Sequence, residues 1–412
     1  MFSSLLKSYT RPAVQRLCAI AACLTIGACA TQSANPVAKV APEPPPAPHQ
    51  LATEAPNFLK LHNLPAGVTP VRVGVILPFD NANAGTRALA KAMMQAAELA
   101  LYDSGNRTIV LMTAEDSGAA GDAAAAATRL LNEGAEIIIG PLFSGSVEAV
   151  APIARDRGVP VLAFSTDRKV AGSGVYLLSF QPENEVKRIV AYAASQGRTK
   201  IGALIPQTAY GDVVEQSFRQ AAKESRVTVC AEARFSPSAG ALTEPAAAVA
   251  KGNCDAILVP QGGSLMRGLA QTLAYSNVDL AKVKLLGTGL WFETTSQKEG
   301  LLTGAWFAAP QPSLDDAFNA KYRATFGSEP PQLASLAYDA VSLVALLASG
   351  TPYHRFTQRA LTDPNGFAGV SGVFRFRTDG SIDRGLAVLG VGPDGFTLVN
   401  PAPVTFQAGP RS

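Results

Sequence analysis

The sequence predicts an α/β protein of two lobes, each built on a mainly parallel sheet that is flanked by helices. From residue 71 onward, short runs of β-branched residues alternate with polar loops and with segments of helical spacing. This alternation is typical of parallel sheets with right-handed crossovers and helices on both faces. About equal numbers of these units precede and follow Phe180, which indicates two lobes with a cleft between them.

The strand candidates are apolar along their whole length, as expected of strands that are covered on both faces. EIII at 136–139 and AILV at 256–259 are the clearest examples. The predicted strands are Val71–Leu77, Thr108–Thr113, Glu136–Ile139, Val159–Ala163, Lys200–Leu204, Thr228–Ala231, Ala256–Val259 and Lys284–Leu286.

The segments between these strands repeat their apolar residues with the period of an amphipathic helix. The predicted helices are Thr86–Tyr102, Gly121–Glu133, Ser146–Arg157, Glu185–Gln196, Asp212–Glu224, Thr243–Lys251 and Leu265–Tyr275.

Residues 1–28 have the features of a secretory signal peptide. Lys7, Arg11 and Arg16 precede an apolar run at 17–26, and no acidic residue occurs before Glu43. A basic segment, an apolar run of about ten residues and small residues at a cleavage site form such a signal, and the run is too short to cross a bilayer. We therefore expect this segment to be removed on export.

The motif IGAC at 26–29 resembles the lipobox of bacterial lipoproteins, with IAAC at 20–23 as a weaker alternative. The resemblance implies that Cys29 is acylated and becomes the first residue of the mature chain. Several acyl chains on one cysteine give stable membrane anchoring. Ala30 in place of Asp favours the outer membrane, so we expect a lipid-anchored protein on the periplasmic side of the cell envelope. An ordinary signal peptide or membrane anchor is the remaining alternative.

Residues 29–69 are expected to form the lipidated cysteine and a Pro/Ala-rich tether. The part at 30–56 has almost no large apolar side chain, so it cannot bury enough surface to fold. Fully extended, it would reach roughly 80 Å from the membrane. The signal accounts for three of the 35 Lys and Arg residues, which leaves 32 cationic against 32 acidic residues in the mature chain. This balance argues against nucleic-acid binding.

Several motifs occur in an order that resembles the type I periplasmic binding proteins, the group of the branched-chain amino-acid receptors. They are IIIGPLFSGS at 137–146, GVPVL at 158–162, FQPEN at 180–184, AYGD at 209–212, AYDAV at 337–341 and GVSGVFRF at 369–376. The resemblance covers about 70–405 and implies one bilobed domain. Its chain would cross between the lobes near 180–184, 304–312 and 368–374. Lobe 1 would hold about 70–181 and 310–368, and lobe 2 about 184–304 and 373–405.

The lipobox, the Pro-rich arm and the phrase FSTDR at 164–168 look most like the penicillin-binding protein activators, which are lipoproteins that stimulate peptidoglycan synthases. This resemblance implies a non-enzymatic regulator of peptidoglycan synthesis whose partner is a penicillin-binding protein. The alternative is a solute-binding receptor of an ABC transporter, which would carry a small polar solute such as an amino acid to a permease.

In open α/β sheets a ligand binds beyond the carboxyl ends of the strands. The candidate side chains in the loops at that edge are Ser144, Ser146, Ser165, Thr166, Tyr210, Gln261 and Trp291. The hydroxyl groups lie near helix starts, where free N–H groups favour a carboxylate or phosphate, but such residues are also ordinary helix caps. Tyr210 and Trp291 would offer aromatic faces, or would only form a turn and pack between the lobes. Gln261 would offer an amide.

An amino-acid ligand would also need a carboxylate for its ammonium group, because an unpaired buried charge is costly. The loop at 287–292 has no acid before Glu293, although Asp167 or Asp80 could substitute. No set of His and Cys residues suits a multi-ligand metal site, and we expect no cofactor. GVGPDG at 390–395 matches a dinucleotide-binding motif by letter only, since it contains a Pro-Asp-Gly turn and no helix follows it.

Cys230 and Cys254 are the cysteines of the mature chain besides Cys29, and each adjoins a predicted strand of the second lobe. Export places them in an oxidising compartment. We expect a disulfide between them if the two strands are neighbours, and two buried free thiols if they are not.

Overall fold

The computed structural model describes residues 55–62, 64–237, 242–292 and 300–407. The signal segment, Cys29 and most of the tether lie outside these ranges. None of the described helices is long and apolar enough to span a membrane.

The first sheet has six strands, and all its pairings are parallel except the one made by its first edge strand. In spatial order they are β1 (Phe58–Lys60), β3 (Ile109–Glu115), β2 (Val71–Leu77), β4 (Ile137–Ile139), β5 (Val161–Ala163) and β6 (Val175–Leu177). Strand β1 lies within the segment expected to be tether. Phe58 and Leu59 pack against the hydrophobic core, so this part of the expected tether belongs to the folded first lobe.

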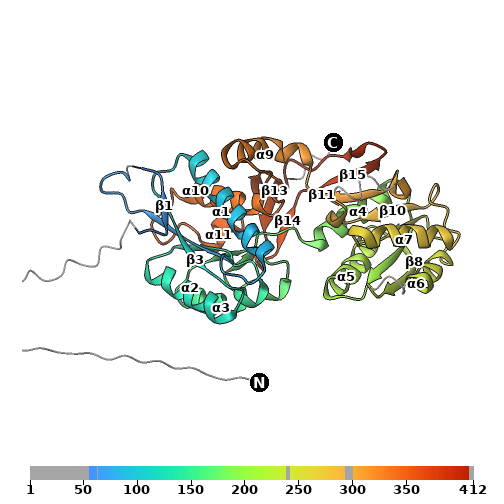
Figure 1. Cartoon of the computed structure of the whole chain (residues 1–412), viewed down its shortest axis with the longest axis horizontal. Coiled ribbons are helices and arrows are strands. Elements are labelled where there is room, and N and C mark those ends of the chain that lie inside the picture. Colours follow the sequence, from blue (N-terminus) through green and yellow to red (C-terminus); the bar gives the residue numbers. More distant parts are fainter. Residues whose placement is uncertain (1–54, 63, 238–241, 293–299, 408–412) are drawn as a thin grey trace, which may run out of the picture. The chain divides into compact units, whose positions relative to one another are not determined.

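Helices cover both faces of this sheet, α1 and α10 on one and α2 and α3 on the other (Figure 1). Strand β4 shows why an uninterrupted apolar run suits this place, since Ile137 and Ile139 enter one core and Ile138 the other. The helices of this lobe are α1 (Ala84–Ser104), α2 (Ala120–Asn132), α3 (Ser144–Asp156), η1 (Arg168–Val170), α9 (Pro312–Phe326), α10 (Ala334–Leu347) and α11 (Gln358–Leu361).

The second sheet has seven strands, with a parallel centre and two antiparallel strands at one edge. In spatial order they are β16 (Gly395–Asn400), β15 (Ala387–Gly392), β11 (Trp306–Ala309), β10 (Lys284–Gly287), β9 (Ala256–Leu258), β7 (Lys200–Pro206) and β8 (Thr228–Phe235). The elements packed around it are α4 (Pro182–Ser195), α5 (Ala209–Glu224), α6 (Thr243–Ala250), α7 (Gly263–Tyr275), η2 (Gly289–Trp291) and η3 (Gly300–Leu302). The predicted fold class of two mainly parallel, helix-flanked sheets is confirmed.

The third crossing between the lobes differs from the prediction. Strands β12 (Phe367–Gly369), β13 (Gly372–Phe376) and β14 (Ile382–Arg384) form a small antiparallel sheet. Phe374, Phe376 and Ile382 are buried in the core of the first lobe, so this sheet belongs there and not to the second lobe. The chain therefore crosses at 385–386 rather than near 368–374. The other crossings, at 178–181 and 310–311, fall close to the predicted ranges.

The strands that adjoin the two cysteines, β8 and β9, are not neighbours, because β7 lies between them. Cys230 and Cys254 nevertheless form a disulfide with their Cα atoms 5.7 Å apart, so the predicted bond is confirmed, whereas its premise of adjacent strands is wrong. The bond fastens the edge strand β8 to the segment that leads into β9.

Candidate functional site

The hydroxyl groups predicted for the first lobe occupy different environments. Strand β4 is followed by Gly140, where a side chain could not fit because a Cβ atom would come 2.0 Å from the carbonyl oxygen of Ile76. The chain then turns into α3, whose N-cap is Phe143 and which has no side-chain cap. Ser144 is half-buried, whereas Ser146 is fully buried and its Oγ has no hydrogen-bond partner. Neither serine is a helix cap, so Ser146 holds an unused donor and acceptor.

Ser165 and Thr166 follow β5 on the same edge of the sheet. Ser165 is buried, and its Oγ accepts a hydrogen bond from the backbone N–H of Asp167 at 3.1 Å. Asp167 in turn caps η1 by accepting from the N–H of Lys169 at 3.0 Å. Thr166 is exposed. Ser165 therefore shapes the turn, and Thr166 is the hydroxyl of this pair that solvent reaches.

The three candidates of the second lobe bond to groups of that same lobe. The Tyr210 hydroxyl lies 2.9 Å from Oγ1 of Thr288. The indole N–H of Trp291 donates to the carbonyl oxygens of Val259 and Gln261, at 3.1 and 2.9 Å. Trp291 is fully buried in the core of the lobe, so the predicted aromatic platform is wrong for this residue.

The third of these candidates, Gln261, donates from its side-chain amide to the carbonyl oxygen of Gly262 at 3.0 Å. All three second-lobe candidates thus have hydrogen-bond partners before any ligand arrives.

A carboxylate missed by the sequence lies beside this group. Glu185, in the first turn of α4, is buried and accepts from the N–H of Gly289 at 3.0 Å. Burial raises the pKa of Glu185 to about 7, the Gly289 hydrogen bond lowers it, and neighbouring Glu183 raises it. Burial and the charge of Glu185 raise the pKa of Tyr210 as well. The acid absent from the loop at 287–292 is therefore supplied by a different segment of the chain.

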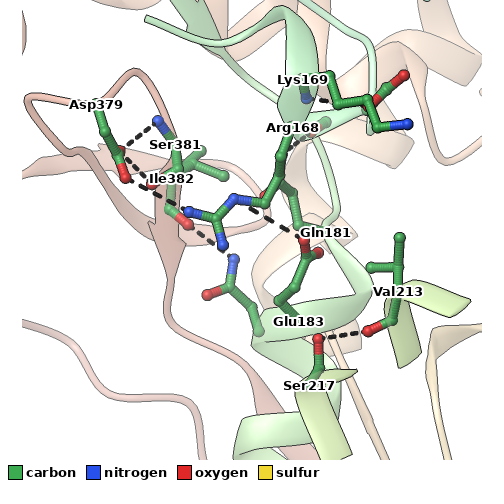
Figure 2. Close-up of polar contacts among 12 residues, drawn as sticks. Arg168, Lys169, Gln181, Glu183, Val213, Ser217, Asp379, Ser381 and Ile382 are labelled. Carbon is green, nitrogen blue, oxygen red and sulfur yellow. Dashed lines mark hydrogen bonds and ion pairs between the residues drawn. The ribbon is translucent and has the colours of Figure 1, made fainter. Parts of the chain in front are cut away.

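A groove with charged walls lies between elements of the two lobes. One wall is formed by α4 and α5, and the other by η1 and the β13–β14 hairpin. Arg168 links the two walls. Its guanidinium lies 3.4 Å from a carboxylate oxygen of Asp379 on its own wall and 3.9 Å from one of Glu183 on the opposite wall (Figure 2). Asn184 of α4 also donates to the carbonyl oxygen of Ile382 at 2.9 Å. We call this cavity of about 1040 Å³ the inter-lobe groove.

The seven candidate residues line neither the inter-lobe groove nor a second cavity of about 710 Å³ beside α2 and β3. Asp167 and Arg168, which directly follow the candidates Ser165 and Thr166, do line the inter-lobe groove. The predicted set is thus not one cluster: in the first lobe Ser146 has no partner and Ser165 holds a turn, and in the second lobe all three candidates have partners. This chemistry suits non-covalent recognition through hydrogen bonds and charges.

A family model described as periplasmic binding protein matches residues 70–395. Among solved structures, a putative branched-chain amino acid ABC transporter protein of Rhodospirillum rubrum has a TM-score of 0.72 at 19% identity, over 80% of this chain and all of that one. A solute-binding protein of R. palustris in complex with benzoate has a TM-score of 0.57 at 18% identity, over 81% and 98% of the two chains. At these identities the likeness concerns the fold.

Similarity to curated proteins is local. The penicillin-binding protein activator LpoA of Vibrio cholerae is 30% identical over 88 residues, which is 21% of this chain and 15% of that protein. LpoA of Pectobacterium parmentieri is 27% identical over 113 residues, 27% of this chain and 16% of its own length. The chain thus matches about a sixth of the length of these activators.

Proposed function

The chain belongs to the periplasmic binding protein family, and we propose that it acts in the cell envelope as a lipid-anchored, non-enzymatic activator of a peptidoglycan synthase. Membership of the family places its work in the periplasm or envelope. The local similarity to penicillin-binding protein activators supports the finer statement. Anchoring through Cys29 in the outer membrane is part of this proposal.

The observation that carries the proposal is the pairing of polar groups in the second lobe. A solute receptor needs convergent polar groups that are free to fix its ligand. Here the hydroxyl of Tyr210, the amide of Gln261 and the indole N–H of Trp291 all have partners in their own lobe. A solute would have to break these hydrogen bonds, and the exchange would gain little free energy.

Activation would work through differential binding. A partner changes an equilibrium only by binding one state more tightly than the other. Two lobes joined by three short crossings provide a surface whose shape depends on the angle between them, as in hinge-type transitions. The tether at 30–56 would allow the domain to reach a synthase anchored in the opposite membrane across roughly 80 Å.

The test uses the protein from Ala30 onward, without its acyl chains, and a purified bifunctional penicillin-binding protein from the same organism. We expect the rate of peptide cross-linking or of glycan polymerisation to rise several-fold and to saturate with added protein. A solute receptor of the same fold serves as the control and should leave the rate unchanged. Absence of both rate enhancement and direct binding would overturn the proposal.

A second candidate, a solute receptor of an ABC transporter, is favoured by one observation. The Oγ of Ser146 is buried without a partner, as expected of a group that waits for a ligand. Amino acids and aromatic acids can be screened by thermal shift, because a solute at 100 times its Kd adds about 2.7 kcal/mol to the stability. A solute that stabilises the protein, together with no effect on the synthase, would favour this alternative.

A further inference from the structure

The inter-lobe groove has the size and the walls of a binding site that the seven predicted residues do not form. Its volume of about 1040 Å³ lies at the upper end of the usual ~300–1000 Å³ of ligand pockets, so it has room for several amino-acid residues. Its walls come from α4 and α5 on one side and from η1 and the β13–β14 hairpin on the other. We propose that this groove binds a short peptide that carries both amine and carboxylate groups.

The charges of the walls define the chemical class of the ligand. Six Lys or Arg residues and six Asp or Glu residues line the groove, so it has no formal net charge to favour a polyanion or a polycation. The apolar side chains among the lining residues are Val213, Ala221 and Ile382. An aliphatic or aromatic solute would find little surface to cover. A ligand with alternating charges would meet complementary groups on both walls.

Some of the charged groups in the walls are held by solvent-exposed ion pairs that a ligand can replace. Lys187 lies 2.9 Å from Glu224, and Arg168 lies 3.4 Å from Asp379. Such solvent-exposed pairs contribute at most about 1 kcal/mol each. Replacing the partner within the protein by a charged group of the ligand therefore costs little free energy.

Two cations, one on each wall, can bind a ligand without giving up an ion pair within the protein. Lys169 is exposed in η1 and Lys223 is exposed near the end of α5. In the part of the chain that the structure describes, neither ammonium group forms an ion pair. These two ammonium groups are suited to carboxylates at two points of an extended ligand.

Glu183 provides an acceptor between the two walls. One of its oxygens faces Arg168 at 3.9 Å, and the other, Oε2, is buried and has no hydrogen-bond partner (Figure 2). A buried oxygen without a donor costs free energy that a ligand amine or amide N–H would recover. In the proposed complex, Glu183 would turn this oxygen into the groove that it lines. The peptide would thus be held by Lys169, Lys223 and Glu183 together.

The test measures the binding of synthetic peptides to the protein from Ala30 onward by calorimetry at low ionic strength. The probes are the tetrapeptide Lys-Glu-Lys-Glu, tetraglutamate, tetralysine and L-leucine. We expect the mixed-charge peptide to bind most tightly and its affinity to fall with added salt. The double variant Lys169→Glu, Lys223→Glu should weaken its binding by about tenfold or more, since each lost charge pair is worth up to ~1 kcal/mol.

The matched control is the double variant Lys91→Glu, Lys251→Glu, which reverses two exposed lysines outside the groove. It changes the net charge by the same amount and should bind the mixed-charge peptide as the wild type does. No binding of that peptide to the wild type would overturn the proposal. Equal weakening in both double variants would also overturn it, because the effect would then be one of net charge. The assay contains no synthase, so its outcome is independent of the proposed activator function.

Discussion

Arg384 and Asp339 form an ion pair in the interior of the first lobe, with Nη1 and Oδ2 3.7 Å apart and both side chains only 1% exposed. Arg384 ends strand β14, directly before the third crossing between the lobes. Its guanidinium stacks on Phe180, in the first crossing, with 4.7 Å to the ring centroid. Asp315 lies in the first turn of α9, just after the second crossing, and its negative charge also favours the charged form of Arg384. One buried cation therefore lies where all three crossings meet.

The contacts of Arg384 are of a kind that tolerates rotation. A cation over an aromatic ring and an ion pair longer than a hydrogen bond depend weakly on angle. By contrast, Arg188 of α4 donates to the carbonyl oxygen of Leu386 at 2.8 Å and fixes the far side of the crossing. Arg384 thus joins segments at the crossings through contacts that are less directional than the hydrogen bond of Arg188.

Replacement of Arg384 tests its contribution to the stability of the protein. We expect Arg384→Met to lower the free energy of unfolding by about 2–4 kcal/mol, because it leaves Asp339 buried without its cation. We expect a smaller loss of unfolding free energy than for a pair that stays fully ionised, because Asp339 can be protonated. The measurement is urea unfolding at pH 7.

The control for this experiment is Arg377→Met, which removes a chemically similar ion pair with Asp383. In this pair the arginine side chain is about half exposed. It should cost at most about 1 kcal/mol. Equal costs for the two variants would show that burial of the Arg384 pair is unimportant.

Two buried carboxyl groups and one half-buried carboxyl group predict how stability depends on pH. Burial raises the pKa of Asp339 to about 7, that of Asp315 to about 6 and that of Glu185 to about 7. Each carboxyl group has a lower pKa in the unfolded chain, so between about pH 4 and 7 the folded state binds more protons. The stability from these groups is therefore complete below pH 4 and is lost as the pH rises through 6 to 7.

The substitution Glu185→Gln isolates one of these groups, because an amide resembles the protonated acid and can still accept from Gly289. We expect the variant to match the wild type in melting temperature near pH 5 and to exceed it by at least ~2 °C at pH 8. Melting curves at several pH values provide the measurement. A difference that is the same at both pH values would contradict the raised pKa of Glu185.

Sequence reasoning placed the strands well and the charged groups badly, for physical reasons. Apolar runs such as 71–77 and 256–259 predict buried parallel strands because both faces of such a strand are covered. Strands β13 and β14 were assigned to the wrong lobe because an alternating hairpin can join either sheet, and long-range packing decides between them. Glu185 was missed because an acid in the first turn of a helix is usually an exposed partner of the helix dipole. Its burial depends on Gly289, 104 residues away.

The disulfide between Cys230 and Cys254 should contribute to the stability of the second lobe. The bond closes a loop of 24 residues, for which chain entropy predicts about 3 kcal/mol. We expect the variant Cys230→Ala, Cys254→Ala to lose about that much in urea unfolding. Reduction of the wild type should give a similar loss, and the variant should be insensitive to reductant. Wild-type protein with an unfolding curve unchanged by reductant would contradict this prediction.

The unpartnered hydroxyl of Ser146 predicts an unusual effect of a core substitution. Ser146→Ala should leave stability unchanged or raise it by about 1 kcal/mol, because it removes a buried group whose desolvation no hydrogen bond offsets. Ser335→Ala is the matched control, since the Ser335 hydroxyl lies 2.9 Å from that of Ser371 and has a partner to lose. We expect this control to be destabilised by about 1–2 kcal/mol. A loss of similar size in Ser146→Ala would mean that its hydroxyl does have a partner in solution, and would remove the observation that favours a solute ligand at this position.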